Sequence, residues 1–299
     1  MSYRFHITDV FTDKPFGGNQ LAVLPDARGL TSEQMQTIAR EFNFSESTFV
    51  FPADDSSHSR KVRIFTPGAE LPFAGHPTVG TAFVLAATGE IRLDGDETRI
   101  IFEEGVGPVP VMIRARNGKP FFSQLTAARV PEKVSTRDDA VTIAKALSLE
   151  SPDVLSSPAA IEAWSVGVPF LFVPLRDLSA VQRARVNTLA WDEAFGSGGT
   201  DDVFLFAQEG DVIRARMFAP SLGVPEDPAT GSAVAALGGY LASRSASRDG
   251  TLRYTVHQGV EMGRPSVLEL EVDVSNGVVS AVRVGGASAL IASGELHVP

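Results

Sequence analysis

The chain has 299 residues, a length that predicts two domains rather than one hydrophobic core. Its 26 basic and 36 acidic residues give a net charge of -10 without a clustered basic stripe, so we expect no nucleic-acid partner. The absence of cysteine excludes disulfides, thiolate metal sites and thiol nucleophiles.

The N-terminus is polar and charged over Met1–Val10, where a secretory signal would need an apolar run. The most apolar helical stretch, about Gly80–Ala87, is far shorter than the ~20 residues that cross a bilayer. We therefore expect a soluble cytoplasmic protein with no membrane partner.

Strands dominate the predicted secondary structure. Alternating or β-branched segments predict strands at Tyr3–Val10, Arg60–Phe65, Arg99–Phe102, Val109–Ala115, Phe170–Val173, Asp211–Phe218, Leu252–His257 and Val267–Val274. Helices are predicted over Thr31–Phe42, after Thr136, and at Leu178–Ala184 and Ala190–Phe195. In the first helix, Thr31 and Gln34 form a capping box, and Leu30 with Met35 forms a hydrophobic staple.

Two further predicted helices, Thr78–Ala87 and Gly231–Ser243, are rich in small residues on most faces. This composition is typical of a helix packed closely on all sides, for example one enclosed by a curved sheet. Simple Ala-rich surface helices are the weaker alternative, because both segments lack charged residues over most of their length.

Both small-residue helices belong to an internal repeat. In the first copy, Arg63-Ile-Phe-Thr-Pro67 precedes His76-Pro-Thr-Val-Gly-Thr-Ala82. In the second, Arg216-Met-Phe-Ala-Pro220 precedes Asp227-Pro-Ala-Thr-Gly-Ser-Ala233. Two matching blocks in the same order indicate a duplication. We therefore predict two related α+β domains with a boundary between Arg114 and Ala127.

The repeat places an ionisable residue, His76 or Asp227, just before each small-residue helix. Free backbone N–H groups and the positive end of the helix dipole favour anions at such positions. Two such ends facing each other would bind a carboxylate or a developing enolate, with Thr78 and Ser232 beside them. A structural histidine would be the favoured interpretation of His76 alone; its pairing with Asp227 favours function.

Glu46 lies in the stretch Asn43–Val50, between a predicted helix and an apolar strand. The pattern alone favours a turn residue that points to water. The alternative is a carboxylate in an apolar pocket, where desolvation would raise its pKa and suit it to general acid–base chemistry.

Other chemistries lack their motifs. The sequence has no Walker loop, no dinucleotide-binding glycine fingerprint and no Gly-x-Ser-x-Gly elbow. Its five histidines are scattered without metal-ligand spacing, so we expect no metal site. Proton transfer by carboxylate and imidazole, without a cofactor, is the chemistry that remains.

Five blocks, in order along about nine-tenths of the chain, resemble the PhzF-like phenazine-biosynthesis family, relatives of diaminopimelate epimerase. They are Asp9-Val10-Phe11 with Gly17-Gly18-Asn19, the run Ser45–Val50, the run Leu71–Pro77, the run Glu226–Ala233, and the run Gln258–Pro265.

The resemblance implies an α+β fold of two similar domains, each a curved, mostly antiparallel sheet or barrel around a central helix. We assign residues 1–118 to the first domain and 119–283 to the second, with a C-terminal strand at about 284–299 returning to the first. The resemblance also implies a homodimer and an active site in the cleft between the domains.

In the phenazine enzyme the glutamate of the Ser-Glu-Ser-Thr motif moves a proton within a dihydro-hydroxyanthranilate substrate, and that position is Glu46 here. The resemblance thus reverses the turn interpretation of Glu46 and adds His76 and Asp227 as catalytic residues. We expect substrate binding by Asn19, Ser45, Gly75, Thr230, Gly231 and Ser232.

Two departures from the family pattern bear on the substrate. Related epimerases and racemases use a pair of cysteines as bases, and this chain has none, which excludes two-thiol racemisation. Family members usually carry proline after the Gly-Asn pair, whereas Gln20 stands here, so we expect a different loop at the pocket and leave the identity of the substrate open.

We therefore predict a cofactor-independent isomerase that moves a proton on a small, cyclic carboxylic acid, like trans-2,3-dihydro-3-hydroxyanthranilate isomerase. An epimerase or lyase for another small acid is one alternative, and substrate screening separates it. A non-catalytic metabolite-binding protein on the same fold is the other, and it would be stabilised by a small acid without turnover.

Overall fold

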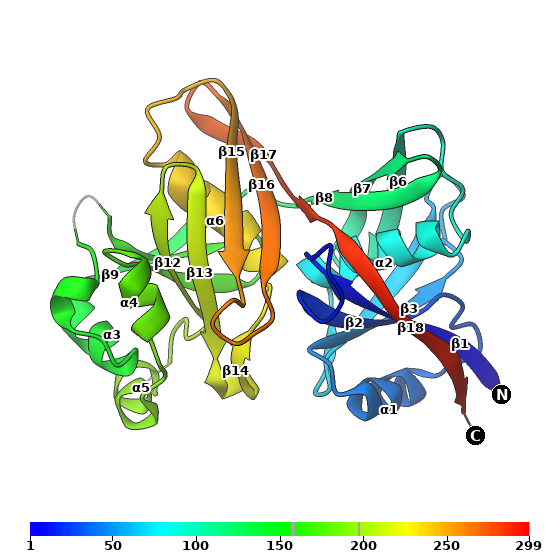
Figure 1. The fold of residues 1–299 in the computed structure, drawn as a ribbon, viewed down its shortest axis with the longest axis horizontal. Helices are drawn as coiled ribbons and strands as arrows, with labels where there is room; N and C mark the ends of the chain where they lie inside the picture. Colours follow the sequence, from blue (N-terminus) through cyan, green and yellow to red (C-terminus); the bar gives the residue numbers. More distant parts are fainter. Residues whose placement is uncertain (157–158, 197, 299) are drawn as a thin grey trace. The chain divides into compact units, whose positions relative to one another are not determined.

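The computed structural model describes residues 1–156, 159–196 and 198–298 (Figure 1). Contacts group the chain into two compact units: unit 1 comprises Met1–Ala128 with Arg283–Pro299, and unit 2 comprises Arg129–Val282. The sequence-based division lies at 118/119, whereas β8 (Lys119–Thr126) pairs with β7 (Gly107–Arg116) inside unit 1. The assignment of these units as domains stays a prediction.

Unit 1 is built on one continuous, mostly antiparallel ladder of strands. Its order is β18–β1–β2–β3–β4–β6–β7–β8, and only the β2–β3 and β4–β6 pairs are parallel within it. The remaining bounds are β1 (Ser2–Val10), β2 (Asn19–Leu24), β3 (Glu46–Phe51), β4 (Arg60–Phe65), β5 (Glu70–Leu71), β6 (Glu97–Glu104) and β18 (Ser288–His297).

The last strand ties the C-terminus to the N-terminus within unit 1. β18 runs antiparallel to β1, and the end of β17 (Val278–Gly286) pairs with β8. The Met1 amino group donates a 2.6 Å hydrogen bond to the Val298 carbonyl, and the Val298 N–H donates back to the Met1 carbonyl at 2.8 Å. The segment predicted to return at about 284–299 thus completes this ladder.

Helix α1 (Ser32–Phe42) begins as its sequence predicts. The Gln34 N–H donates to Thr31 Oγ1 at 3.2 Å, and the Thr31 N–H donates to Gln34 Oε1 at 3.0 Å, so the capping box is confirmed. Leu30 and Met35 are buried in the same hydrophobic cluster under this helix. Local sequence signals therefore fix both the start and the buried face of α1.

Helix α2 (Gly75–Ala87) is the central helix of unit 1, and its residues up to Ala86 are all buried. It contacts β1, β2, β3, β7, β8 and β18, as predicted for a small-residue helix enclosed by a sheet. The helix begins at Gly75 rather than Thr78, so the prediction that His76 precedes it is wrong: His76 lies in the first turn. Pro77 is tolerated there because N–H groups in the first turn have no partner within the helix.

Unit 2 repeats this design. Its ladder is β9–β10–β11–β12–β13–β15–β16, with β11–β12 and β13–β15 parallel. The strands are β9 (Glu132–Arg137), β10 (Ile161–Ser165), β11 (Pro169–Pro174), β12 (Val203–Glu209), β13 (Val212–Ala219), β14 (Val224–Asp227), β15 (Gly250–Gln258) and β16 (Ser266–Ser275). The helices are α3 (Ala140–Ala146), α4 (Leu178–Arg183), α5 (Thr188–Phe195) and the enclosed α6 (Gly231–Ala242).

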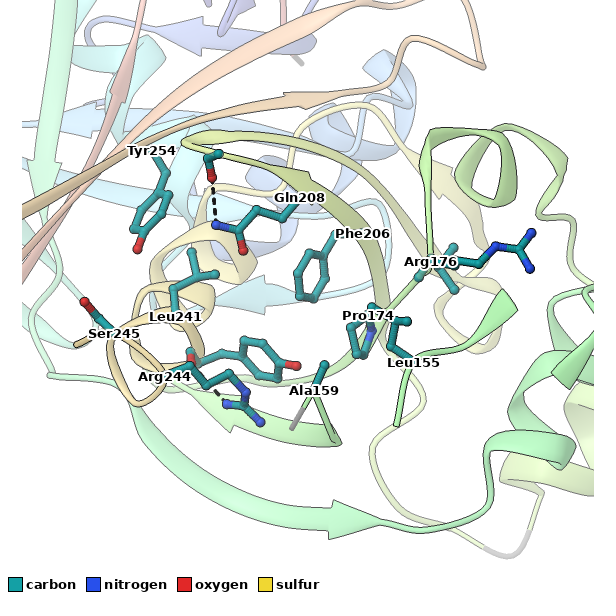
Figure 2. Close-up of a pocket in the computed structure, with 13 residues that line it drawn as sticks. Leu155, Ala159, Pro174, Arg176, Phe206, Gln208, Leu241, Arg244, Ser245 and Tyr254 are labelled. Atoms are coloured by element: carbon teal, nitrogen blue, oxygen red, sulfur yellow. Dashed lines mark hydrogen bonds between the residues drawn. The ribbon is translucent and has the colours of Figure 1, made fainter. Parts of the chain in front are cut away.

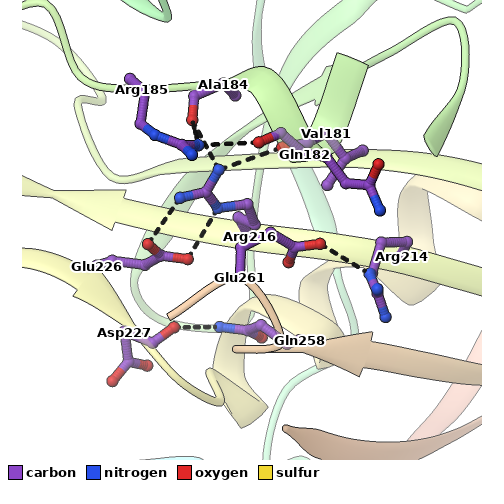
Figure 3. A network of polar contacts seen from close by, with 10 residues as sticks. All are labelled: Val181, Gln182, Ala184, Arg185, Arg214, Arg216, Glu226, Asp227, Gln258 and Glu261. Carbon is purple, nitrogen blue, oxygen red and sulfur yellow. Dashed lines mark hydrogen bonds and ion pairs between the residues drawn. The ribbon is translucent and has the colours of Figure 1, made fainter. Parts of the chain in front are cut away.

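The repeated Arg-x-Phe-x-Pro blocks occupy equivalent strands, β4 and β13. In unit 1, Arg63 makes two hydrogen bonds to Glu70 of β5. In unit 2, Arg216 makes two to Glu226 of β14 (Figure 3). Each guanidinium also lies about 5 Å from the ring of the phenylalanine two residues later, an arrangement that favours cation–π attraction. The predicted α+β class with two similar halves is confirmed.

No helix within the described residues has the length and apolar character that bilayer crossing requires.

Candidate active site

In unit 1 the structure brings Glu46 and His76 together. Glu46 is the first residue of β3, which pairs in parallel with β2, and His76 lies in the first turn of α2. Glu46 Oε2 lies 3.6 Å from His76 Nε2. The Glu46 side chain is only 16% exposed, so the turn interpretation, with the carboxylate pointing to water, does not describe its position.

The third member of this group is Asn19, the first residue of β2. Its Nδ2 lies 3.3 Å from His76 Nδ1, so the amide holds one edge of the ring while the Nε2 edge is turned to Glu46. Asn19 is 2% exposed and His76 is 4% exposed. We refer to Asn19, Glu46 and His76 as the unit 1 triad.

Burial lowers the pKa of His76 to about 3. The imidazole is therefore neutral at physiological pH, and its contact with Glu46 is a polar contact rather than an ion pair. Nε2 is buried and has no hydrogen-bond partner among the described residues, since 3.6 Å exceeds hydrogen-bond distance. Buried polar atoms are normally hydrogen-bonded, so Nε2 has a hydrogen-bonding capacity that no described residue uses.

Two predicted binding positions flank the triad. Ser45 directly precedes β3 and is partly exposed, and Gly75 is the buried first residue of α2. N–H groups in the first turn of α2 have no partner within the helix, because the first four N–H groups of any α-helix lack one. The carboxylate and the neutral imidazole of the triad therefore lie beside a helix start that suits an anionic group.

In unit 2 the predicted residues surround the segment that leads into α6. Asp227 is the last residue of β14, and its Oδ2 accepts a 2.6 Å hydrogen bond from Thr230 Oγ1. Thr230 is the N-cap position of α6, which begins with Gly231 and Ser232. Asp227 thus lies four residues before the helix, and Thr230 connects its side chain to the helix start.

Gln258, the fully buried last residue of β15, holds this segment in place (Figure 3). Its Nε2 donates to the Asp227 carbonyl at 2.8 Å and to Thr230 Oγ1 at 2.9 Å. Its Oε1 accepts from the Thr230 N–H at 3.1 Å. The sequence singled out Gln258 only as part of a matching block; its role follows from a pairing across 28 residues or more.

Gly259, the residue after Gln258, lies so close to the segment that carries Asp227 that no side chain would fit there. Its φ is +72°, and a Cβ built there would lie 2.4 Å from the Arg264 carbonyl oxygen and 2.6 Å from that of Pro228. Only glycine permits so close an approach to the segment that carries Asp227.

The predicted site residues therefore form one group in each unit. His76 contacts both Asn19 and Glu46 in unit 1, and Asp227 and Thr230 contact each other in unit 2. The expectation that both groups serve one active site stays a prediction. In the described part of the chain, no group of three or more His, Asp or Glu side chains could hold a metal ion.

A cavity of about 460 Å³ in unit 2 contains none of the predicted site residues (Figure 2). Phe206, Tyr240, Leu241, Arg244 and Tyr254 are among its lining. Tyr240 and Leu241 lie in the last turn of α6, whereas Gly231 begins that helix, so the cavity and the predicted residues occupy different ends of α6.

Comparison with known proteins shows which family the chain resembles. The profile of a family described as Phenazine biosynthesis-like protein (PhzC-PhzF) matches residues 8–294. A protein of Mesorhizobium japonicum described as an uncharacterized isomerase is 37% identical, with 97% of each chain covered. The trans-2,3-dihydro-3-hydroxyanthranilate isomerase of Pseudomonas aeruginosa is 35% identical, with 99% of each chain covered.

A solved structure of a predicted epimerase from Pseudomonas aeruginosa superposes with a TM-score of 0.81 at 35% identity, covering 99% of this chain and 100% of that one. Together these similarities confirm the family resemblance found in the sequence, the fold class and an isomerase as the class of enzyme.

Proposed function

Because the chain belongs to the phenazine biosynthesis-like protein family, we propose that it isomerises a small cyclic carboxylic acid without a cofactor, as trans-2,3-dihydro-3-hydroxyanthranilate isomerase does. The observation that carries this proposal is the contact between Glu46 and His76. It provides a carboxylate and a neutral imidazole side by side, two groups that can carry out general acid–base proton transfer.

Glu46 acts as the base. Its carboxylate takes an acidic proton from a carbon next to a conjugated or carboxylate-bearing system and returns a proton to another carbon on the same face. Because Glu46 is only 16% exposed, water competes weakly for that proton. A positioned general acid–base group of this kind contributes about 10²- to 10⁴-fold to the rate.

His76 orients the substrate and exchanges a proton with one of its heteroatoms through Nε2. The lowered pKa of His76, caused by burial, keeps the ring neutral, so it can donate or accept one hydrogen bond without carrying charge. Asn19 holds the opposite edge of the ring and so limits its rotation.

We propose that Asp227 of unit 2 also orients the substrate and relays protons to its heteroatoms. Ser232 and the backbone N–H groups near Gly75 and Gly231 stabilise the delocalised anion. The interlocked hydrogen bonds of Asp227, Thr230 and Gln258 support this role, because they hold the Asp227 segment in one conformation.

The test is proton NMR of dihydro-hydroxyanthranilate in D₂O with the native enzyme and with Glu46→Gln. We expect isomerisation with deuterium entering one carbon, and loss of both in the variant. A folded Glu46→Gln protein with the native rate would refute Glu46 as the base. A folded native enzyme that leaves this compound unchanged would refute the substrate and direct screening to other small carboxylic acids.

An epimerase for another small acid is the second candidate, supported by the similarity to a predicted epimerase. Such an enzyme would use Glu46 on one face of the substrate, because the chain has no cysteine for a two-thiol mechanism. Deuterium exchange with inversion at one carbon, without movement of a double bond, would distinguish it.

We also propose that the enzyme is a cytoplasmic homodimer. The family resemblance supports the dimer, and the absence of cysteine is compatible with a reducing compartment. Light scattering after size-exclusion chromatography tests the dimer, and a mass near the 31.8 kDa of one chain would refute it.

A further inference from the structure

Glu104, the last residue of β6, is a buried acid beside the helix that carries His76. It is 8% exposed and lies in the interior of unit 1. Its Oε1 is 2.7 Å from Thr78 Oγ1, and Thr78 Oγ1 donates to the carbonyl of Ala74 at 2.8 Å. Ala74 is the N-cap position of α2, so Glu104 contacts the first turn of that helix through Thr78.

Gln258 holds the equivalent position in unit 2. β6 pairs in parallel with β4, as β15 does with β13, and Glu104 and Gln258 are the last residues of these two strands. Gln258 fixes the segment from Asp227 to Thr230 with three hydrogen bonds. In each unit, one buried polar side chain from an equivalent strand therefore supports the start of the central helix: Glu104 through Thr78 in the first turn of α2, and Gln258 through the segment before α6.

Glu104 and Gln258 are each followed by a glycine, Gly105 and Gly259, which supports the equivalence of the two positions. A Cβ on Gly105 would lie 2.7 Å from Pro72 Cα, and a Cβ on Gly259 would lie 3.0 Å from Pro228 Cα. Both glycines allow a strand end to approach the loop that leads to the central helix. The Val106 N–H also donates to the Pro72 carbonyl at 3.1 Å. The repeat thus includes a Glu/Gln-Gly pair that the sequence blocks did not reveal.

The two hydrogen bonds at Thr78 can exist together only if Glu104 is neutral. Thr78 Oγ1 is within donor distance of both the Ala74 carbonyl and Glu104 Oε1, but a hydroxyl has one proton, so the second bond needs a protonated carboxyl as donor. Burial raises the pKa of Glu104 to about 8 and outweighs a hydrogen bond from Thr78, which lowers it, so burial favours the neutral acid. In the neutral state Glu104 resembles the uncharged Gln258.

The surrounding charges do not provide Glu104 with a counter-ion. It shares a cavity of about 690 Å³ with Asp54, Lys61, Arg63, Glu70 and Glu103. Lys61 pairs with Asp54, Arg63 with Glu70, and Glu103 with His58 of the loop before β4. Glu104 Oε2 is buried without a hydrogen-bond partner among the described residues.

We propose that Glu104 is a positioning residue that, as a neutral acid, holds the first turn of α2 through Thr78 and so fixes His76 relative to Glu46. This inference rests on the proposed function, in which His76 and Glu46 are the reacting pair. Glu104 does not touch the substrate; it acts through the backbone of α2.

The experiment compares Glu104→Gln, Glu104→Leu and Thr78→Val, with Glu97→Gln as a control on the exposed start of β6. Two readouts are used: kcat and KM with dihydro-hydroxyanthranilate, and the imidazole ¹⁵N shifts of His76. We expect Glu104→Gln and the control to match the native enzyme. Glu104→Leu and Thr78→Val should lower kcat about 10- to 100-fold with little change in KM, and move the His76 signals, because a small misplacement of a catalytic group is costly.

Native kcat and unmoved His76 signals in Glu104→Leu would overturn the proposal. So would a Glu104→Gln variant as impaired as Glu104→Leu, because a neutral side chain would then not suffice. If Glu104→Leu does not fold, Thr78→Val decides, since it leaves the carboxyl in place. If the native enzyme does not convert the substrate, the proposed function fails, while the His76 signals still test the role of Glu104.

Discussion

Arg216 and Glu226 are joined by two hydrogen bonds of 2.8 Å, from Nε to Oε1 and from Nη2 to Oε2. Arg216 Nη1 also donates to the carbonyls of Val181 and Ala184 at the end of α4. This single side chain therefore connects β13, β14 and α4, and it is 4% exposed (Figure 3). Its counterpart Arg63 binds Glu70 in the same way but is 26% exposed.

The repeat thus provides a matched pair for a stability measurement. We expect Arg216→Met to reduce the free energy of unfolding by about 3–5 kcal/mol, because it leaves Glu226 and two carbonyls without their donor in a dry environment. Arg63→Met should cost about 0–1 kcal/mol, because solvent screens its pair. Urea denaturation of both variants tests this, and equal losses would contradict it.

Glu46→Gln should reduce kcat by about 10²- to 10⁴-fold, because the amide cannot accept the substrate proton. The thermal stability should stay close to native, since Gln has nearly the same shape and Glu46 lies at a strand end. Glu41→Gln, on the exposed surface of α1, is the matched control and should retain the native rate. A similar loss in both variants would point to a general effect on folding.

Glu104 should make stability depend on pH. Its folded-state pKa of about 8 lies above the ordinary value of 4.5, so the folded protein keeps this proton where the unfolded chain releases it. The contribution of the protonated acid is complete below about 4.5 and is lost as pH rises towards 8. The difference in unfolding free energy between Glu104→Gln and the native protein should therefore grow across this range; a constant difference would contradict the assignment.

His76 should affect stability in the opposite direction. Its pKa is lowered from 6.5 to about 3, so the unfolded chain takes up a proton that the folded protein excludes. The contribution of the neutral ring is complete above about 6.5 and is lost as pH falls towards 3. A His76→Asn variant should show less acid destabilisation than the native protein in urea titrations between these pH values; an unchanged acid limb would contradict it.

Gly259 and Gly263 provide a test of the support under Asp227. Both have positive φ, but a Cβ on Gly259 would meet two carbonyl oxygens, whereas one on Gly263 would meet nothing within 4 Å. Gly263→Ala should cost about 1–2 kcal/mol from the left-handed backbone alone. Gly259→Ala should cost more and also lower kcat, measured beside denaturation curves. Equal effects on both quantities would show that the close approach is unimportant.

The sequence alone determined the features that depend on neighbouring residues. The capping box of Thr31 and Gln34 formed as predicted because its partners are three residues apart. The small-residue composition of α2 and α6 indicated enclosed helices, since only small side chains allow close packing on all faces. The repeated blocks indicated two similar halves because equivalent strands need equivalent residues, as Arg63 and Arg216 show.

Tertiary structure decided what depends on distant residues. The local pattern favoured a turn at Glu46, but parallel pairing of β2 and β3 and the position of α2 bring the carboxylate to His76, thirty residues later in the chain. Glu104 and Gln258 carry no local signal for their roles, because their partners Thr78 and Asp227 lie 26 and 31 residues away in the chain. Burial decides the protonation of Glu104, since removal from water raises the pKa of its carboxyl in the folded chain.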